Sequence, residues 1–152
     1  MVIIQTNDFD HAAQYQALRA AGPTTGAVAT FTGLVRDFGD QSQVSGLFLE
    51  HYPGMTERVI EDLIRQASQR WDVQAVRVIH RVGELALGDQ IVFVGVSSAH
   101  RGDAFAACQF IMDALKTTAP FWKKELAADG DHWVEQKDSD LEQAQQWQDD
   151  TP

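Results

Sequence analysis

The chain has 152 residues, a length typical of one domain with a substantial core. A hydrophobic content of 44% and a charged content of 22% are ordinary for a globular protein, and no apolar run approaches the roughly 20 residues of a membrane span. The net charge of −10 argues against a general binder of nucleic acids or anionic membranes, because such proteins need a basic surface.

The N-terminal part of the chain predicts a short strand, a helix and a longer strand. Residues 2–4 are apolar and can form an edge strand, and Asn7 or Asp8 can cap the helix that follows. Residues 26–35 are rich in β-branched and aromatic side chains without a helical period, which predicts a strand covered on both faces. Gly33 within this strand indicates a bulge or a close backbone approach.

A polar loop, a second long strand and a helix come next. Arg36 stands where the strand gives way to the glycine-containing loop 37–42. Residues 44–52 predict the strand that brings the chain back. After a turn at residues 53–54, apolar residues recur every three or four positions over 59–71, which predicts an amphipathic helix.

The middle of the chain predicts two further strands and another helix. Alternation over residues 76–82 is typical of a strand, and the apolar run 91–96 is typical of a buried one; glycine-containing turns separate the two. Residues 97–103 are expected to form a loop from strand to helix. An apolar stripe over residues 104–115 predicts the helix.

That stripe contains residues that could carry chemistry. Cys108 lies on it, which favours a buried inert thiol over a nucleophile. Phe105 and Met112 are expected in the core rather than in a binding site. Because Cys108 is the single cysteine, no internal disulfide is possible; the first residues also lack the basic segment of a secretion signal, so we expect a cytoplasmic protein.

The C-terminal part predicts a hairpin and a tail. Residues 121–126 and 133–137 are expected to be strands on either side of the turn at 129–130. We expect one domain over residues 1–137 and a polar, acidic tail over 138–152, with a short helix near its middle and disordered last residues. The mixture of strands and helices, with hairpin signals at both ends, predicts an α+β domain.

Residues 116–125 place three lysines beside a proline and two aromatic residues. Pro120 cannot continue a helix, so Lys116 should lie in the last turn of a helix, and Lys123 and Lys124 on a strand. A lysine at a helix end or on a strand is also favoured without any function. The segment alone therefore leaves both interpretations open.

A second group of basic residues follows the buried strand. His100 and Arg101 stand between that strand and a helix, where helix N-terminal amides attract anions and arginine can grip a phosphate. Alternatively, Arg101 pairs with Asp103 and His100 merely caps the loop. Residues 125–152 hold nine acidic residues and one basic residue, a net charge of −8, so residues 1–124 carry only −2. A site for a small anion is compatible with this distribution.

Other kinds of site lack their sequence patterns. The five histidines show no zinc spacing, and one cysteine cannot form a metal cluster, so we expect no metal and no cofactor. The chain has no nucleophile elbow, P-loop or dinucleotide fingerprint. The residues themselves thus predict an anion-binding pocket with a lysine available for acid–base or covalent work.

Five ordered segments resemble the family of the large, catalytic subunit of molybdopterin synthase, known as MoaE. The resemblance covers about residues 26–137, and its motifs are residues 30–36, 49–55, 80–84, 98–101 and 116–125. It implies an α/β-hammerhead fold with an additional antiparallel sheet. It also implies a homodimer flanked by two small, ubiquitin-like sulfur-carrier subunits (MoaD-like), that is, a heterotetramer.

The resemblance implies a sulfurtransferase of molybdenum cofactor biosynthesis. The family converts cyclic pyranopterin monophosphate (precursor Z) into molybdopterin by adding the two sulfurs of a dithiolene, each brought as a thiocarboxylate on the C-terminal Gly-Gly of a small subunit. A different class of function is also open: a non-catalytic dimeric module that binds an anionic metabolite or a Gly-Gly protein tail. Nucleic acid and membranes are not expected partners.

The resemblance also implies site residues. Lys116 matches the essential active-site lysine, and Lys123 matches a second lysine near the arriving C-terminus of the partner. The family shares its pocket across the dimer, which implies that His100 and Arg101 serve the pocket of the second copy. Lys137 stands where family members often have arginine, and lysine lacks the planar fork that holds an anion at two points. Thr118 stands where some have a basic residue. Neither residue is therefore assigned to the substrate-binding set. The implied substrate-binding residues are Leu34, Val35, Arg36, His100, Arg101, Lys116, Lys123, Lys124 and Glu125.

Overall fold

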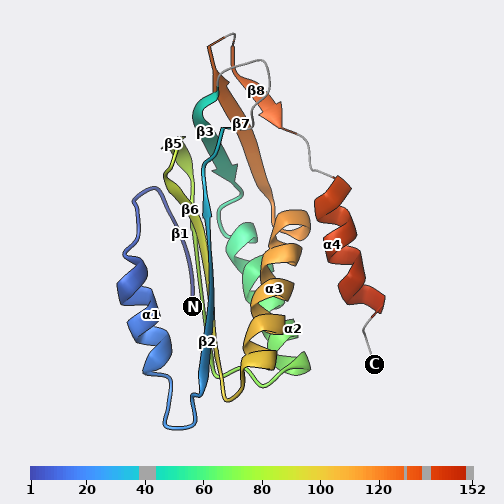
Figure 1. Cartoon of the computed structure of the whole chain (residues 1–152). Coiled ribbons are helices and arrows are strands. Elements are labelled where there is room, and N and C mark those ends of the chain that lie inside the picture. Colours follow the sequence, from blue (N-terminus) through green and yellow to red (C-terminus); the bar gives the residue numbers. More distant parts are fainter. Residues whose placement is uncertain (38–43, 129, 135–137, 150–152) are drawn as a thin grey trace.

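The computed structural model describes residues 1–37, 44–128, 130–134 and 138–149. Its two four-stranded sheets and its helices confirm the predicted α+β class with an additional antiparallel sheet (Figure 1). In chain order the elements are β1 (Val2–Gln5), α1 (His11–Arg19), β2 (Ala27–Leu34), β3 (Val44–His51), α2 (Met55–Arg70), β4 (Ala75–Arg81), β5 (Gly83–Ala86), β6 (Gln90–Ser98), α3 (Arg101–Thr118), β7 (Phe121–Ala127), β8 (His132–Val134) and α4 (Asp138–Asp149).

The first sheet has the strand order β1-β4-β6-β2. The strand β1 runs parallel to β4, and the other pairs are antiparallel. Helix α1 covers one face of this sheet, while α2 and α3 cover the other (Figure 1). The central strand β6 is buried from Val92 to Ser98, as its continuous apolar sequence predicts.

The second sheet has the order β5-β3-β7-β8 and is antiparallel throughout. It lies at one end of the molecule, beyond the helices α2 and α3 (Figure 1). Its inner face joins a small core cluster in which Leu47 and Leu49 of β3 meet Leu85 of β5 and Val35. Because β7 follows α3 directly, the C-terminal end of that helix is brought beside this sheet.

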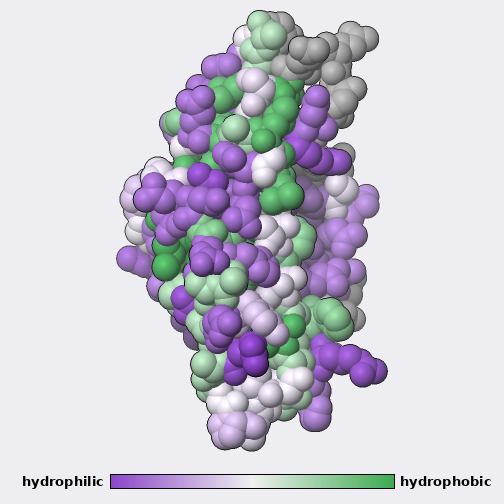
Figure 2. Space-filling model, turned by 60° about the vertical axis from the view of Figure 1, so that its left-hand side comes forward, coloured by the Kyte–Doolittle hydropathy of each residue, from purple (hydrophilic) through white to green (hydrophobic). Residues whose placement is uncertain are grey.

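Several large apolar side chains stay exposed on the single chain. Among the described residues these include Phe31, Leu34, Phe105, Trp122 and Trp133. Figure 2 shows one face of the molecule, on which hydrophobic residues gather toward the upper part among predominantly hydrophilic ones. Exposed apolar area of this kind is common on proteins that associate with a partner.

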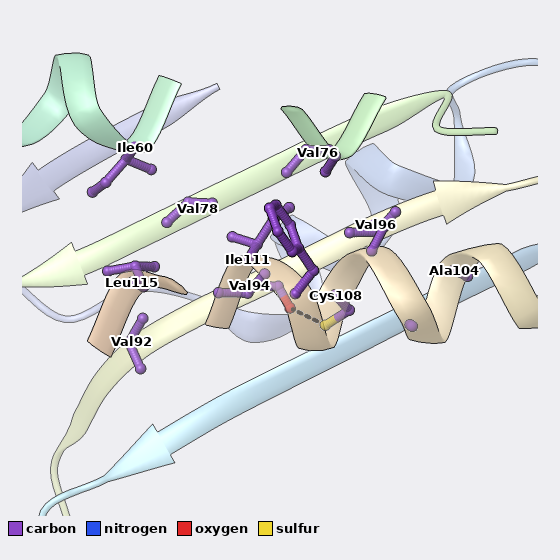
Figure 3. Packing of buried hydrophobic residues seen from close by; sticks show 14 residues of the cluster. Ile60, Val76, Val78, Val92, Val94, Val96, Ala104, Cys108, Ile111 and Leu115 are labelled. Atoms are coloured by element: carbon purple, nitrogen blue, oxygen red, sulfur yellow. Dashed lines mark hydrogen bonds between the residues drawn. The ribbon is translucent and has the colours of Figure 1, made fainter. Parts of the chain in front are cut away.

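The main core lies between the first sheet and the helices α2 and α3 (Figure 3). Val92 and Val94 of β6 point toward Ile111 and Leu115 of α3, and all four side chains are buried. The intervening Phe93 points to the opposite face, where it packs edge-to-face on Phe9 at a ring-centroid distance of 5.9 Å. The period of two along β6 thus supplies both faces of the sheet with core residues.

Two local predictions in the first half of the chain are wrong. Helix α1 is capped by Asp10, whose carboxylate accepts from the backbone N–H groups of Ala12 and Ala13, and not by Asn7 or Asp8. The strand β2 is not covered on both faces, because it is an edge strand and Leu34 at its end is 55% exposed. The bulge predicted at Gly33 is confirmed by a register shift between residues 33 and 34.

Three further corrections concern the middle of the chain. Residues 83–86 form the strand β5, where only turns had been predicted between two strands. The loop before α3 is shorter than expected, because Ser97 and Ser98 still belong to β6 and the helix begins at Arg101. Phe105 is 65% exposed and does not belong to the core.

Residues at the C-terminal end form a longer helix than expected. The 12-residue α4 lies against α3 (Figure 1), anchored by Trp147, whose ring meets those of Trp71 and Phe110 at 5.5 and 5.8 Å. The indole N–H of Trp147 donates to the Asp113 carboxylate at 2.8 Å. Residues 135–137, which include part of a predicted strand and the predicted domain boundary, lie outside the described residues, as do the last residues 150–152, so the boundary stays a prediction.

Candidate active site

A cavity of about 670 Å³ opens where the C-terminal end of α3 meets the ends of both sheets. Its apolar wall comes from β2, β6 and α3, with Val92, Met112 and Leu115 among the lining residues. Strands β3, β4, β7 and β8 and helix α4 complete it. The polar side chains that line it are those of Thr32, Arg36, His80, Lys116, Thr117, Lys123 and Asp140.

The break at Pro120 brings two of the predicted lysines to this cavity. Lys116 lies in the last turn of α3, and the backbone turns extended at Ala119, with φ −74° and ψ 133°. Strand β7 then begins at Phe121, and Lys123 on it lines the same cavity as Lys116. Lys123 lies opposite Leu49 of β3 and Val134 of β8, which also line the cavity.

The turn between α3 and β7 is fixed by a fully buried hydroxyl of α2. Thr56 donates from its Oγ1 to the carbonyl oxygen of Pro120 at 3.1 Å and accepts there from the backbone N–H of Tyr52 at 3.0 Å. Because the hydroxyl uses its hydrogen on Pro120, one side chain joins the start of α2 to the turn that separates Lys116 from Lys123. The relative placement of the two lysines therefore depends on α2 as well as on their own elements.

Lys124 faces away from the cavity. Neighbouring residues of a strand point to opposite faces, and the ammonium of Lys124 lies 5.3 Å from the ring centroids of both Phe48 and Trp133. Glu125 shares the face of Lys123 but is not among the residues that line the cavity. The structure therefore does not bring Lys124 and Glu125 to Lys116 within one chain.

The remaining predicted residues divide between the cavity and other places. Leu34 and Arg36 line the cavity, whereas Val35 between them is buried in the cluster of the second sheet. His100 is the N-cap of α3 and Arg101 is its first residue. Fifteen residues of helix, roughly 22 Å, separate Arg101 from Lys116, so one chain cannot place both in one pocket.

The simpler interpretation of the loop before α3 is not supported by the described contacts. Asp103 accepts from the backbone N–H of Asp72 at 3.2 Å, and the described residues contain no ion pair between Arg101 and Asp103. The side chain of His100 makes no capping hydrogen bond to α3.

Cys108 is the buried, inert thiol that its position on the helix predicts. It is 6% exposed, and its thiol donates to the carbonyl oxygen of Val94 at 3.6 Å (Figure 3). Burial raises its pKa to about 12, because the thiolate would lose its hydration. At neutral pH the thiol therefore stays protonated, the form in which a cysteine is a poor nucleophile.

Sequence reasoning assigned no role to four polar residues of the cavity, Thr32, His80, Thr117 and Asp140. His80 could have been noticed because it shares the buried face of its strand with Val76 and Val78, an unusual position for a titratable side chain. Asp140 gave no signal, since it reaches the cavity from α4, a helix expected to be part of a polar tail.

The part of the chain that the structure describes contains no group of three or more histidine, cysteine or acidic side chains placed to hold a metal ion. Nor is any described helix long and apolar enough to cross a membrane.

Comparison with known proteins identifies the family. Residues 4–118 match the family described as MoaE protein. A relative from Vibrio cholerae serotype O1, named molybdopterin synthase catalytic subunit, is 56% identical over 147 residues, which cover 97% of each chain. A solved structure of the molybdopterin biosynthesis MoaE protein from Burkholderia ambifaria is 48% identical, with a TM-score of 0.81 over 97% of each chain.

A second solved structure extends the match to a more distant sequence. Molybdopterin synthase from Staphylococcus aureus is 29% identical to this chain, with a TM-score of 0.80 over 88% of this chain and 96% of its own. The fold is thus retained at low sequence identity, and the more similar proteins match this chain over nearly its full length. The chain belongs to the MoaE protein family.

Proposed function

We propose that the chain is the catalytic subunit of a molybdopterin synthase, a sulfurtransferase that converts cyclic pyranopterin monophosphate into molybdopterin. The observation that carries the proposal is that Lys116 from a helix end and Lys123 from a strand line one cavity of about 670 Å³. A volume of this size suits a small molecule such as a pterin. Near-full-length relatives with the corresponding name support the same conclusion.

The roles of the cavity residues follow from their charge and place. Lys116 acts as the acid–base group when the pterin ring opens and sulfur is added, and Lys123 receives the C-terminus that brings the sulfur. Arg36 binds the phosphate of the substrate, since its guanidinium can hold two oxygens at once, and Leu34 packs beside it.

A second copy of the chain completes this cavity with its own His100 and Arg101. These two residues lie at the far end of α3 from Lys116, so only another chain can bring such a pair to the cavity. The exposed apolar residues of the single chain, among them Phe31 and Leu34 on the edge strand β2, favour association. We therefore propose a homodimer.

The sulfur comes from a partner protein. Cys108 cannot supply it, because the thiol is buried and protonated at neutral pH. A small sulfur-carrier subunit that ends in a Gly-Gly thiocarboxylate would insert its flexible tail into the cavity beside Lys123. One such subunit for each chain of the homodimer gives a heterotetramer. The single, unpaired cysteine of this chain, Cys108, suits a cytoplasmic location.

The test is reconstitution from purified components. The chain is incubated with a thiocarboxylated small subunit and cyclic pyranopterin monophosphate, and the pterin is followed by mass spectrometry in a single turnover. The expected product is molybdopterin, with two sulfurs gained for each pterin. Tight binding of the pterin with no gain of mass would instead identify a non-catalytic module that binds an anionic metabolite.

Replacing the cysteine tests where the sulfur comes from. Cys108→Ala is expected to make molybdopterin within about twofold of the wild-type rate, because the thiol touches only the core. It should cost about 1 kcal/mol in the free energy of unfolding, as small truncations in a core do. The measurements are the single-turnover rate and the thermal midpoint. A Cys108→Ala variant that folds but gives no product would mean that this thiol carries sulfur.

A further inference from the structure

His80 is a titratable side chain of the cavity to which none of the roles above is assigned. It lies near the end of β4, opposite Val92 of β6, and Val92 in turn lies opposite Gly33 of β2. All three residues line the cavity, and His80 is only 8% exposed. A histidine in such a place is either a core residue that happens to border the cavity or a group that contacts what binds there.

The tautomer of His80 is determined by its neighbour on the strand. Its Nδ1 lies 2.8 Å from the carbonyl oxygen of Arg81, and a carbonyl can only accept, so Nδ1 carries the hydrogen. The lone pair is then on Nε2. Among the described residues Nε2 has no hydrogen-bond partner. Of their side-chain nitrogen and oxygen atoms without a partner, only the hydroxyl oxygen of Thr32 is sealed from solvent, so Nε2 is not sealed. Nε2 is therefore reachable, and it is reachable from the cavity that His80 lines.

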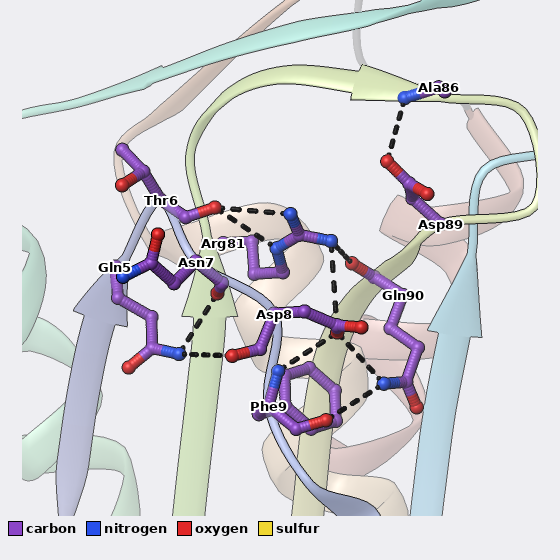
Figure 4. Close-up of polar contacts among 9 residues, drawn as sticks. All are labelled: Gln5, Thr6, Asn7, Asp8, Phe9, Arg81, Ala86, Asp89 and Gln90. Carbon is purple, nitrogen blue, oxygen red and sulfur yellow. Dashed lines mark hydrogen bonds and ion pairs between the residues drawn. The ribbon is translucent and has the colours of Figure 1, made fainter.

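The orientation of the ring is fixed from two sides. The imidazole stacks on Phe121, with ring centroids 3.8 Å apart and planes 18° from parallel. The carbonyl that holds Nδ1 belongs to Arg81, whose guanidinium donates to the carbonyl oxygens of Thr6 and Gln90 (Figure 4). A ring with one face and one nitrogen held in this way keeps its other nitrogen in a constant direction.

The charge of the ring is also fixed at neutral pH. The pKa of His80 is lowered to about 4, chiefly by burial; the hydrogen bond to the Arg81 carbonyl opposes this shift, and the nearby Lys116 on α3 and His51 on β3 add to it. The imidazole is therefore neutral. The cavity thus contains a neutral ring acceptor and the hydroxyls of Thr32 and Thr117, among the cations Arg36, Lys116 and Lys123 and the anion Asp140.

We propose that His80 is a substrate-binding residue whose Nε2 accepts a hydrogen bond from a ring N–H of the pterin. This inference rests on the proposed function. Cations in the cavity recognise the phosphate but cannot accept a hydrogen from the heterocycle, whereas a neutral imidazole can. A hydrogen bond at this point would turn the pterin so that its reacting carbons face Lys116.

Three substitutions separate this role from a merely structural one. His80→Phe keeps a ring to stack on Phe121 and loses both nitrogens. His80→Gln places an amide oxygen near the position of Nε2, and His80→Asn places an amide N–H near the position of Nδ1. In the reconstituted complex we expect His80→Phe and His80→Asn to raise the KM for the pterin about tenfold with kcat within about twofold, and His80→Gln to restore most of the affinity.

The opposite pattern would overturn the proposal. If His80→Asn keeps the wild-type KM and His80→Gln does not, the hydrogen bond from Nδ1 to the Arg81 carbonyl is what matters, and the role of His80 is structural. An unchanged KM in His80→Phe would overturn it as well. Thermal midpoints measured on the same samples identify any variant that is unfolded. If His80→Phe is unfolded, the comparison of His80→Gln with His80→Asn still tests the proposal.

A second measurement does not depend on turnover. In wild-type protein labelled with ¹⁵N-histidine, the Nε2 resonance of His80 is expected to shift when the pterin is added without the small subunit, while Nδ1 stays protonated. A resonance that stays in place at saturating pterin would contradict the inference. Wild-type protein that gives this shift yet makes no molybdopterin with its partner would contradict the proposed function and leave the role of His80 standing.

Discussion

Lys116→Ala is expected to lower the single-turnover rate of molybdopterin formation by about 100-fold or more, the usual range for loss of a general acid–base group. The side chain lines the cavity from the last turn of α3, and the described residues offer no other amine there except that of Lys123. The measurement is the rate at saturating pterin and thiocarboxylated partner. Full activity of the variant would remove Lys116 from the mechanism.

Two companion variants show what the lysine contributes. Lys116→Arg keeps the positive charge but cannot give up its proton, so it should bind the pterin with a nearly normal KM and turn it over slowly. Arg58→Ala removes an exposed cation of α2 outside the cavity and should stay active. Thermal midpoints should change little in Lys116→Ala, because a charge at a helix end is worth about 0.3–1 kcal/mol.

Arg81→Met is expected to produce the largest loss of stability, about 3 kcal/mol in the free energy of unfolding. The nearly buried guanidinium donates to the carbonyl oxygens of Thr6 and Gln90 at 3.0 to 3.2 Å and lies 3.8 Å from the Asp8 carboxylate (Figure 4). Methionine fills similar space but leaves both carbonyls without this donor, and each unpaired acceptor costs about 1–3 kcal/mol. For a chain of this size the thermal midpoint should fall by roughly 6–12 °C.

Arg77→Met is the matched control on the same strand. Its guanidinium makes one described hydrogen bond, to the side-chain amide of Gln14 at 2.7 Å, so the expected loss is about 1 kcal/mol. Chemical denaturation of both variants gives the comparison. Equal losses would mean that the contacts of Arg81 with Thr6 and Gln90 contribute little.

Asp8 gives this network a dependence on pH that can be followed in the same experiments. Hydrogen bonds from Gln90 and from the backbone N–H of Phe9 lower the pKa of Asp8, with a smaller contribution from Arg81. A carboxyl group whose pKa is lower in the folded state stabilises the fold above its unfolded pKa and loses that contribution as the pH falls. The contribution of Asp8 is therefore present at neutral pH and lost in acid, and it is small because the side chain is 64% exposed.

Signals that are local in the sequence predicted the centre of the site. Pro120 ends α3 wherever the rest of the chain lies, and the period of two along a strand separates Lys123 from Lys124. Both lysines could therefore be assigned to their elements from sequence. That they line one cavity depends on the contact of Thr56 with Pro120, which joins segments 64 residues apart and leaves no local pattern.

The missed features depend on the tertiary structure. The sequence Gly-Glu-Leu-Ala of β5 has no strand pattern of its own, and it becomes a strand because β3 offers it an edge to pair with. Phe105 is apolar on an apolar helix, yet it lies on a side of α3 that no described element of the single chain covers. Asp140 reaches the cavity only because Trp147 holds α4 against α3.

Val35 and Lys124 show why residues next to a site residue in sequence should not be assigned to the same site from family resemblance alone. Each stands next to a residue that lines the cavity, and each points away from it because strands and extended segments alternate. His100 and Arg101 are separated from Lys116 by the length of one helix. This distance could be calculated from the sequence, because the helix was predicted and its rise per residue is known.

The state of Cys108 has a practical consequence for spectroscopy of this protein. Its thiol is buried and stays protonated far above neutral pH, so maleimides and methanethiosulfonates should leave it unmodified while the chain is folded. A cysteine introduced at the exposed Ser68 of α2 would then be the one reactive thiol of the chain. Fluorescent or spin labels can thus be attached at chosen positions in the otherwise native sequence, and distances between copies in the assembled enzyme become measurable.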